Sequence, residues 1–322
     1  MFSRISCSSH GSVLTAAVAV AGVLGVSSLA SAVILYEPFN YPSVANGATM
    51  VGVTTNATGL TGSYSLGAGT NAAGATDSDM TYDTTGLTFG NLQTQGGSVV
   101  VTSTSNQRSS LAVQLNISPA ANSTLYGSFI FNSSANANPG YAVAGLLLGS
   151  QTQIDNNSTI SILAEAYNQS NGYINLPGIT SAAGTGTTLS LNTTYMELFQ
   201  VSGINGTSGP ISASEWTLTA AQFANFQGNL TAAVLNAAPT GTAATDVTQM
   251  ATLTDSSPSS YPDISSSNYL SLFSYNMTNQ YDEVRLSTTS LSDVTPVPEP
   301  TTLGLVAVCG LGLLLLKRRK AI

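Results

Sequence analysis

The sequence predicts an all-β fold, a single jelly-roll β-sandwich. Short runs of Val, Ile, Leu, Tyr and Phe alternate with clusters of Gly, Asn, Ser, Thr and Pro at intervals of roughly ten residues, as strands and turns do in sandwiches. No long stretch has the 3.6-residue periodicity of an amphipathic helix. No segment recurs along the chain, so neither a solenoid nor a propeller is expected.

The first strand is expected to begin at Val33 and to end at Pro38, because proline cannot donate to a sheet ladder. The strand expected at 194–201 is apolar on both faces, which predicts a central position in its sheet. Alternation or short apolar runs predict the other strands at 85–92, 98–102, 111–117, 125–131, 141–148, 159–166, 215–218, 229–235, 248–254 and 269–275.

Two pairings and one helix are also expected. The strands 125–131 and 141–148 flank a loop with an Asn-Pro-Gly turn and should form an antiparallel pair. The strand 159–166 should pair with the segment that follows it. A short helix is expected at 219–226, with Thr219 as its N-cap and Gln222 three residues later, as in a capping box.

The first 32 residues have the pattern of a secretory signal peptide. Arg4 precedes an apolar stretch at 13–26, and the small residues Ala30 and Ala32 flank Ser31 in an A-x-A cleavage site. The alternative is an N-terminal membrane helix that is retained. In either case the segment lies outside the β-sandwich.

The C-terminal tail has three parts. A motif of Val297, Pro298, Glu299 and Pro300 is followed by an apolar span at 301–316 and by the basic residues Lys317, Arg318, Arg319 and Lys320. As a helix the span would rise roughly 24 Å, which is short for a bilayer, but lysine and arginine side chains can reach the headgroups. The basic cluster predicts a cytoplasmic C-terminus, so the body lies outside the cytoplasm.

This order of motif, span and basic cluster resembles the PEP-CTERM signal of Gram-negative bacteria. The resemblance covers only the tail, 297–322. It implies that an exosortase recognises the Pro-Glu-Pro tripeptide, that the C-terminal helix holds the protein in the inner membrane transiently, and that the protein then reaches the cell surface or the extracellular matrix. The alternative is a plain single-span anchor.

The body between these segments, 33–296, is strongly acidic. It carries fourteen Asp and Glu residues against only Arg108 and Arg285, a formal charge of −12. A nucleic-acid partner is therefore excluded, because phosphate binding needs a cationic surface. The sole histidine, His10, and both cysteines, Cys7 and Cys309, lie in the terminal segments. Zinc sites of the Cys/His kind, Cys nucleophiles, Ser-His-Asp triads and disulfides are thus not available to the body.

The two ends of the body carry a second resemblance. The phrase Leu-Tyr-Glu-Pro-Phe-Asn-Tyr at 35–41 resembles the start of concanavalin-A-like (LamG-like) jelly-roll domains, and Tyr-Asp-Glu-Val-Arg-Leu at 281–286 resembles their closing strand. The resemblance implies that the first and last strands lie near each other and that 33–296 is one domain. Asp282 and Glu283, beside Arg285, are expected to be structural ion-pair partners.

Three candidate sites follow from the remaining polar residues. Asp77, Asp79 and Asp83 form the densest acidic cluster and could hold Ca²⁺, with a solvated loop as the alternative. Glu165 and Glu197 are the nominated pair for a glycosidase, which needs two carboxylates across a groove; the alternative is a structural role. Trp216, together with Tyr167, Tyr173 or Tyr261, could stack on a sugar, with core packing as the alternative for Trp216.

Taken together, these features predict an exported, non-enzymatic surface or matrix protein. The alternatives are a carbohydrate-binding module for exopolysaccharide and a glycan-degrading enzyme. The expected partners are an exosortase, the membrane through the C-terminal helix, and exopolysaccharide. No cofactor is expected other than the calcium ion considered above.

Overall fold

The computed structural model describes residues 33–67, 76, 79–92, 94–103, 108–136, 142–149, 159–166, 172–176 and 182–296. The predicted signal peptide with Ala30 and Ala32, and the whole tail from Val297 onward, lie outside these residues. Within the described part of the chain, no helix is long and apolar enough to cross a membrane.

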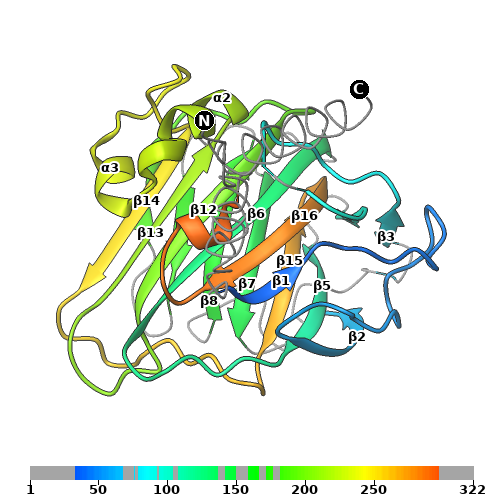
Figure 1. The fold of residues 1–322 in the computed structure, drawn as a ribbon, viewed down its shortest axis with the longest axis horizontal. Coiled ribbons are helices and arrows are strands. Elements are labelled where there is room, and N and C mark those ends of the chain that lie inside the picture. Colours follow the sequence, from blue (N-terminus) through cyan, green and yellow to red (C-terminus); the bar gives the residue numbers. More distant parts are fainter. Residues whose placement is uncertain are drawn as a thin grey trace, which may run out of the picture. The chain divides into compact units, whose positions relative to one another are not determined.

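The described residues form two antiparallel sheets (Figure 1). The larger sheet has the order β11 (Thr185–Gly186), β14 (Gln249–Asp255), β13 (Ile211–Leu218), β12 (Thr194–Ile204), β6 (Ser123–Asn136), β16 (Met277–Ser287), β4 (Ser98–Thr102) and β3 (Met80–Asp83), with β1 (Val33–Glu37) also paired to β16. The smaller sheet has the order β10 (Ala182–Ala183), β9 (Gly172–Asn175), β8 (Thr159–Ala166), β7 (Ala142–Gly149), β15 (Tyr269–Tyr275), β5 (Arg108–Leu115) and β2 (Leu60–Leu66). The predicted jelly-roll sandwich is confirmed.

The main core lies between the inner faces of the two sheets. On β12, Tyr195, Phe199 and Val201 face this core, whereas Met196 and Leu198 face a second apolar cluster on the outer face of the larger sheet. Because β12 lies between β6 and β13 and is buried on both faces, its predicted central position is confirmed.

Two short helices cover the outer cluster, and Figure 1 shows them beside β13 and β14. The first, α2 (Ala220–Phe226), begins at the predicted capping box of Thr219 and Gln222. After a 3₁₀ turn (Gln227–Asn229), α3 (Ala232–Ala237) begins at its own N-cap, Thr231. The strand predicted at 229–235 is therefore wrong: a capping threonine before an alanine-rich segment favours a helix, and its Leu235 packs into the outer cluster.

The hairpin predicted from 125–131 and 141–148 is also wrong. Both strands exist, but β6 pairs with β12 and β16 in the larger sheet, whereas β7 pairs with β8 and β15 in the smaller one. Alternation identifies a strand without identifying its neighbour. By contrast, the expected pairing of 159–166 with the following segment is confirmed as β8 with β9.

The segment 85–92 forms a loop, not the predicted strand. Gly90 adopts a left-handed backbone conformation at φ 54°, which a strand does not contain. Leu87, Phe89 and Leu92 are buried in the outer cluster, so the apolar pattern reflects a loop packed over the sheet.

The first and last strands lie side by side, as the resemblance implied. β1 and β16 are antiparallel partners, with Val33 opposite Ser287 and Glu37 opposite Val284. After β16 the chain makes a 3₁₀ turn, η3 (Ser292–Val294).

Candidate functional site

The outer face of the smaller sheet gathers aromatic and polar side chains. On β15, Leu270 and Leu272 belong to the core between the sheets, so the alternating Tyr269, Phe273 and Tyr275 lie on the opposite, outer face. The sequence predicted a strand at 269–275. The alternation of Tyr269, Phe273 and Tyr275 with Leu270 and Leu272 could also have indicated that the three aromatic residues share one face.

Cross-strand register extends this face over four neighbouring strands. Phe273 lies opposite Gly145, Gly145 opposite Leu163, and Leu163 opposite Tyr173. Three strand spacings place Tyr173 about 14 Å from Phe273 along this row. Since a Cβ on Gly145 would stand only 2.3 Å from Cδ2 of Leu163, the leucine fills the position that the glycine leaves open. The row therefore has an apolar floor between two aromatic side chains.

Arg108, one of the two cations of the body, lies at one end of this face. Its guanidinium carbon is 5.5 Å from the centre of the Tyr275 ring, opposite it in the ladder. Strand alternation and cross-strand pairing place further polar residues on the same face. They carry amide and hydroxyl groups: Ser110, Gln114, Ser161, Asn175 and Ser271. The position of Glu165, opposite Val143, also alternates onto this face, but its side chain lies outside the described atoms.

The partly exposed side chains of this face include Tyr173, Tyr269, Tyr275, Gln114 and Asn175, whereas Phe273 and the serines are buried. Stacking and hydrogen bonding with a hydroxyl-rich ring would therefore involve the partly exposed residues.

The nominated glycosidase pair does not come together as an accessible site in the described structure. Glu197 is 0% exposed and faces the core between the sheets, where its Oε2 accepts a hydrogen bond from Thr217 Oγ1 at 2.7 Å. Its Oε1 has no partner among the described residues, and burial raises the pKa of this carboxyl to about 8. Glu165 lies on β8, paired with Val143, but its side chain lies outside the described atoms.

A second buried carboxylate near Glu197 was not singled out from the sequence. Glu215 lies on β13 opposite Phe199 of the neighbouring strand and is also fully buried. A Cβ on Gly172, in the facing sheet, would stand 2.3 Å from Glu215 Oε1, so the two sheets are in close contact there. Both acids therefore lie inside the sandwich, away from any polymer outside it.

The opening segment 35–41 is organised by one carboxylate, Glu37. Its Oε1 accepts from the Phe39 amide at 2.6 Å, and its Oε2 accepts from the hydroxyls of Tyr41 at 2.8 Å and Tyr64 at 2.5 Å. Burial raises the pKa of Glu37, and the hydroxyl donors oppose that rise. Glu37 is thus a structural acceptor that folds residues 37–41 back on themselves.

The closing phrase forms the predicted ion pair. The Arg285 guanidinium bonds the Glu283 carboxylate, and both side chains are buried. Asp282 instead accepts from the backbone amide of Leu87 at 2.8 Å, which ties the 85–92 loop to β16. Burial, followed by the neighbouring Glu283 charge, raises the pKa of Asp282 to about 9.

The described aspartates of the acidic cluster accept hydrogen bonds from residues of their own turns. Asp79 Oδ2 accepts from the amide and hydroxyl of Thr76 at 2.7 and 2.9 Å, and Asp83 Oδ1 accepts from the Thr85 amide at 2.8 Å. Asp77 lies outside the described residues. Within the described ranges no three acidic, histidine or cysteine side chains gather around a common point, and the calcium site stays a prediction.

The structure contradicts the predicted role of Trp216 in stacking on a sugar. Its ring is 0% exposed in the outer cluster, and its Nε1 donates to Asn236 Oδ1 at 2.9 Å, so it has no face for a ligand. Tyr261 donates its hydroxyl to the Gly209 carbonyl at 2.8 Å, and Tyr167 lies outside the described residues. Of the tyrosines named with Trp216, Tyr173 is the one that the described structure places on the aromatic face.

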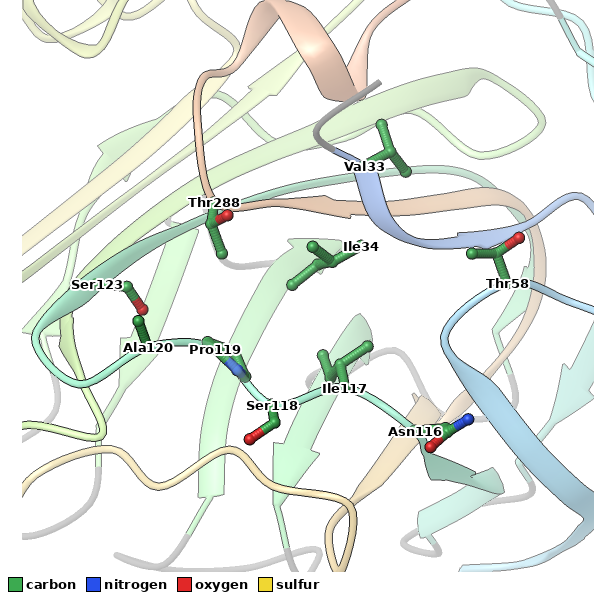
Figure 2. A pocket seen from close by; sticks show the side chains of 10 residues that line it. All are labelled: Val33, Ile34, Thr58, Asn116, Ile117, Ser118, Pro119, Ala120, Ser123 and Thr288. Atoms are coloured by element: carbon green, nitrogen blue, oxygen red, sulfur yellow. The ribbon is translucent and has the colours of Figure 1, made fainter. Parts of the chain in front are cut away.

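A pocket of about 670 Å³ lies where the body begins (Figure 2). It is lined by uncharged residues: Val33, Ile34, Thr58, Asn116, Ile117, Ser118, Pro119, Ala120, Ser123 and Thr288. Figure 2 shows Ile34 and Ile117 extending between β1 and the 116–120 segment. No side chain of this lining titrates near neutral pH, so the pocket offers no acid or base for catalysis.

Comparison with known proteins identifies the tail. Residues 296–320 match the PEP-CTERM protein-sorting motif, which makes this an exported protein sorted to the cell envelope. No match was found among curated proteins.

Solved structures of low similarity share jelly-roll, lectin-like folds. The PL-14 alginate lyase of Aplysia kurodai is 9% identical (66% of this chain, 88% of that one, TM-score 0.38), and arcelin-5 of Phaseolus vulgaris is 10% identical (66% and 93%, TM-score 0.33). The Emp46p carbohydrate recognition domain is 10% identical (68% and 94%, TM-score 0.34). Likenesses of this size carry no information about activity.

Proposed function

We propose that this protein is an exosortase substrate whose exported domain acts at the cell surface or in the extracellular matrix by binding, not by catalysis. The placement of the acids carries this proposal. Glu37, Glu197, Asp282 and Glu283 are all buried, and each accepts a hydrogen bond within the sandwich. A glycoside hydrolase needs two carboxylates facing its substrate across a groove.

A carbohydrate is the ligand that the outer face of the smaller sheet suits best. Tyr173, Tyr269 and Tyr275 present rings, and Arg108, Gln114 and Asn175 present donors on the same face. With a formal charge of −12 on the body, a neutral polysaccharide is favoured over a polyanionic one. This role as an exopolysaccharide-binding module is the second part of the proposal.

A glycan array tests both parts. The full-length protein is held in a detergent without a sugar headgroup and compared with Tyr173→Ala and Tyr269→Ala. Each variant should bind a neutral glycan at least about fivefold more weakly, since a lost aromatic contact is worth about 1 kcal/mol or more. Tyr126→Ala, which alters a half-buried tyrosine on the outer face of the larger sheet, is the matched control and should bind normally.

Two results would count against the proposal. Release of shortened products from the bound glycan would indicate an enzyme. Equal binding by Tyr173→Ala, Tyr269→Ala and Tyr126→Ala would move the binding surface elsewhere.

A further inference from the structure

The folded body ends in a tight turn directly before the sorting motif. Residues 291–295, here called the C-terminal clasp, include η3 and follow the last strand by three residues. Leu291 and Val294 of the clasp are buried in the outer cluster of the larger sheet, which also contains Ile130 and Leu198. The end of the domain is therefore packed against the sandwich.

Hydrogen bonds hold the clasp closed. Ser128 Oγ, on β6, donates to the Val294 carbonyl at 2.6 Å in a buried contact. Thr295 Oγ1 donates to the Leu291 carbonyl at 3.1 Å, which closes the turn on itself. Ser287 Oγ donates to Asp293 Oδ2 at 3.1 Å, so the clasp is also tied to the end of β16.

The clasp leaves little chain between the sandwich and the membrane. From Pro296 to Thr301, where the predicted apolar span begins, the chain makes five Cα–Cα steps, which reach at most roughly 18 Å. The headgroup layer occupies about 6 Å of that length. The remaining ~12 Å is the diameter of one helix with its side chains. An enzyme that approaches the Pro298-Glu299-Pro300 tripeptide from the water must fit between the folded sandwich and the bilayer within this length.

We infer that the clasp restricts access to the sorting motif, and that processing of the folded protein waits for residues 291–295 to open. This inference rests on the exosortase role proposed above. Opening would release the five residues of the clasp as extended chain and lengthen the connection by up to roughly 17 Å, which widens access to the motif. In a newly exported chain that has not yet folded, the same motif would be accessible at once, so folding and processing compete.

The reaction itself needs only ordinary acyl chemistry. In its hydrolytic form one peptide bond of the tail breaks, its carbonyl carbon is attacked by water and becomes a carboxylate, and the leaving nitrogen takes a proton and stays on the membrane-bound fragment. The clasp takes no part in these steps and acts on access alone.

Pulse-chase labelling in an exosortase-bearing host tests the inference, with loss of full-length protein as the readout. A ten-residue Gly/Ser insertion between Pro296 and Val297 should speed the loss at least about fivefold, as should Ser128→Ala, because one hydrogen bond shifts an opening equilibrium by about that factor. The same insertion between Ser208 and Gly209, an exposed turn, is the matched control and should leave the rate unchanged.

A second control separates the clasp from general stability. Ser212→Ala removes a hydroxyl pair with Ser202 between β12 and β13, at 2.8 Å, and neither strand carries Ser128 or Ser287, whose hydroxyls bond the clasp. If Ser212→Ala accelerates processing as much as Ser128→Ala, or if the insertion after Pro296 has no effect, the clasp does not control access. If alanine replacement of Pro298, Glu299 and Pro300 leaves processing intact, the protein is not an exosortase substrate, whatever rate the insertion variant shows.

Discussion

Tyr36 on the first strand lies directly opposite Arg285 on the last strand, and the guanidinium carbon sits 4.6 Å from the centre of the tyrosine ring. Glu283 bonds the same guanidinium, so the partly buried ring and the buried carboxylate both contact one cation. Burial raises the pKa of Tyr36 to about 12. One arginine therefore links side chains of the first and last strands, in addition to their backbone pairing.

Replacing that arginine should be costly. Arg285→Ala would leave Glu283 buried without its cation, and breaking a buried pair in this way costs about 3–5 kcal/mol. Urea unfolding should show this loss. In the Glu283→Gln background, where no carboxylate is left unpaired, Arg285→Ala should cost clearly less. An equal cost in both backgrounds would show that the pair does not account for the effect.

The buried carboxyl of Glu197 should make stability depend on pH. Burial raises its pKa from 4.5 to about 8, so the folded chain holds a proton that the unfolded chain releases. Its contribution to the free energy of unfolding is therefore complete below about pH 4.5 and is lost as the pH rises through about 8.

Glu197→Gln tests this contribution, and Glu215→Gln is measured in parallel because the first substitution also changes the surroundings of that neighbouring buried carboxylate. The unfolding free energy of the Glu197→Gln variant minus that of the wild type should increase between pH 4.5 and 8, by up to about 1.4 kcal/mol per pH unit. Urea unfolding across this range measures it. A difference that stays constant with pH would mean that Glu197 titrates normally.

Much of the fold could be predicted, and each wrong prediction has a physical cause. Tyr269–Tyr275 forms β15 over the whole predicted range, since its alternation reflects one face on the core. The 85–92 and 229–235 segments were mistaken for strands because residues packed over the outer face of a sheet are as apolar as strand residues. The partner of β6 could not be predicted, because pairing between distant strands leaves no local signal.

The candidate site was less predictable than the fold. Tyr173 was named from its residue type, but its companions Phe273 and Tyr275 become neighbours only through the register of β8, β7 and β15. Glu197 and Trp216 were nominated for chemistry that their burial rules out, since one sequence does not reveal which face of a fully apolar strand points to solvent.

A cross-strand pair of Gly127 and Phe199 supplies a sharp packing test. The two residues lie opposite each other on β6 and β12, and a Cβ on Gly127 would stand 2.0 Å from Cζ of the Phe199 ring. Gly127→Ala should therefore destabilise the fold by about 1–3 kcal/mol in urea unfolding, the usual cost of overpacking. Phe199→Leu should reduce the cost of adding the methyl group. If Gly127→Ala costs the same with Phe199→Leu as without it, the ring does not cause the clash.

Substitution of the tail motif distinguishes a processing signal from a permanent anchor. Both roles use the apolar span 301–316, but membrane insertion has no need of the Pro298-Glu299-Pro300 tripeptide, because the tripeptide lies outside the span and the basic cluster sets the orientation. Replacing the three residues with alanine should leave insertion intact and block release. Full-length protein should then accumulate in the inner membrane of an exosortase-bearing host, as fractionation and immunoblotting would show. If the triple-alanine protein reaches the surface in wild-type amounts, the tripeptide has no sorting role and the C-terminal helix is a simple tether.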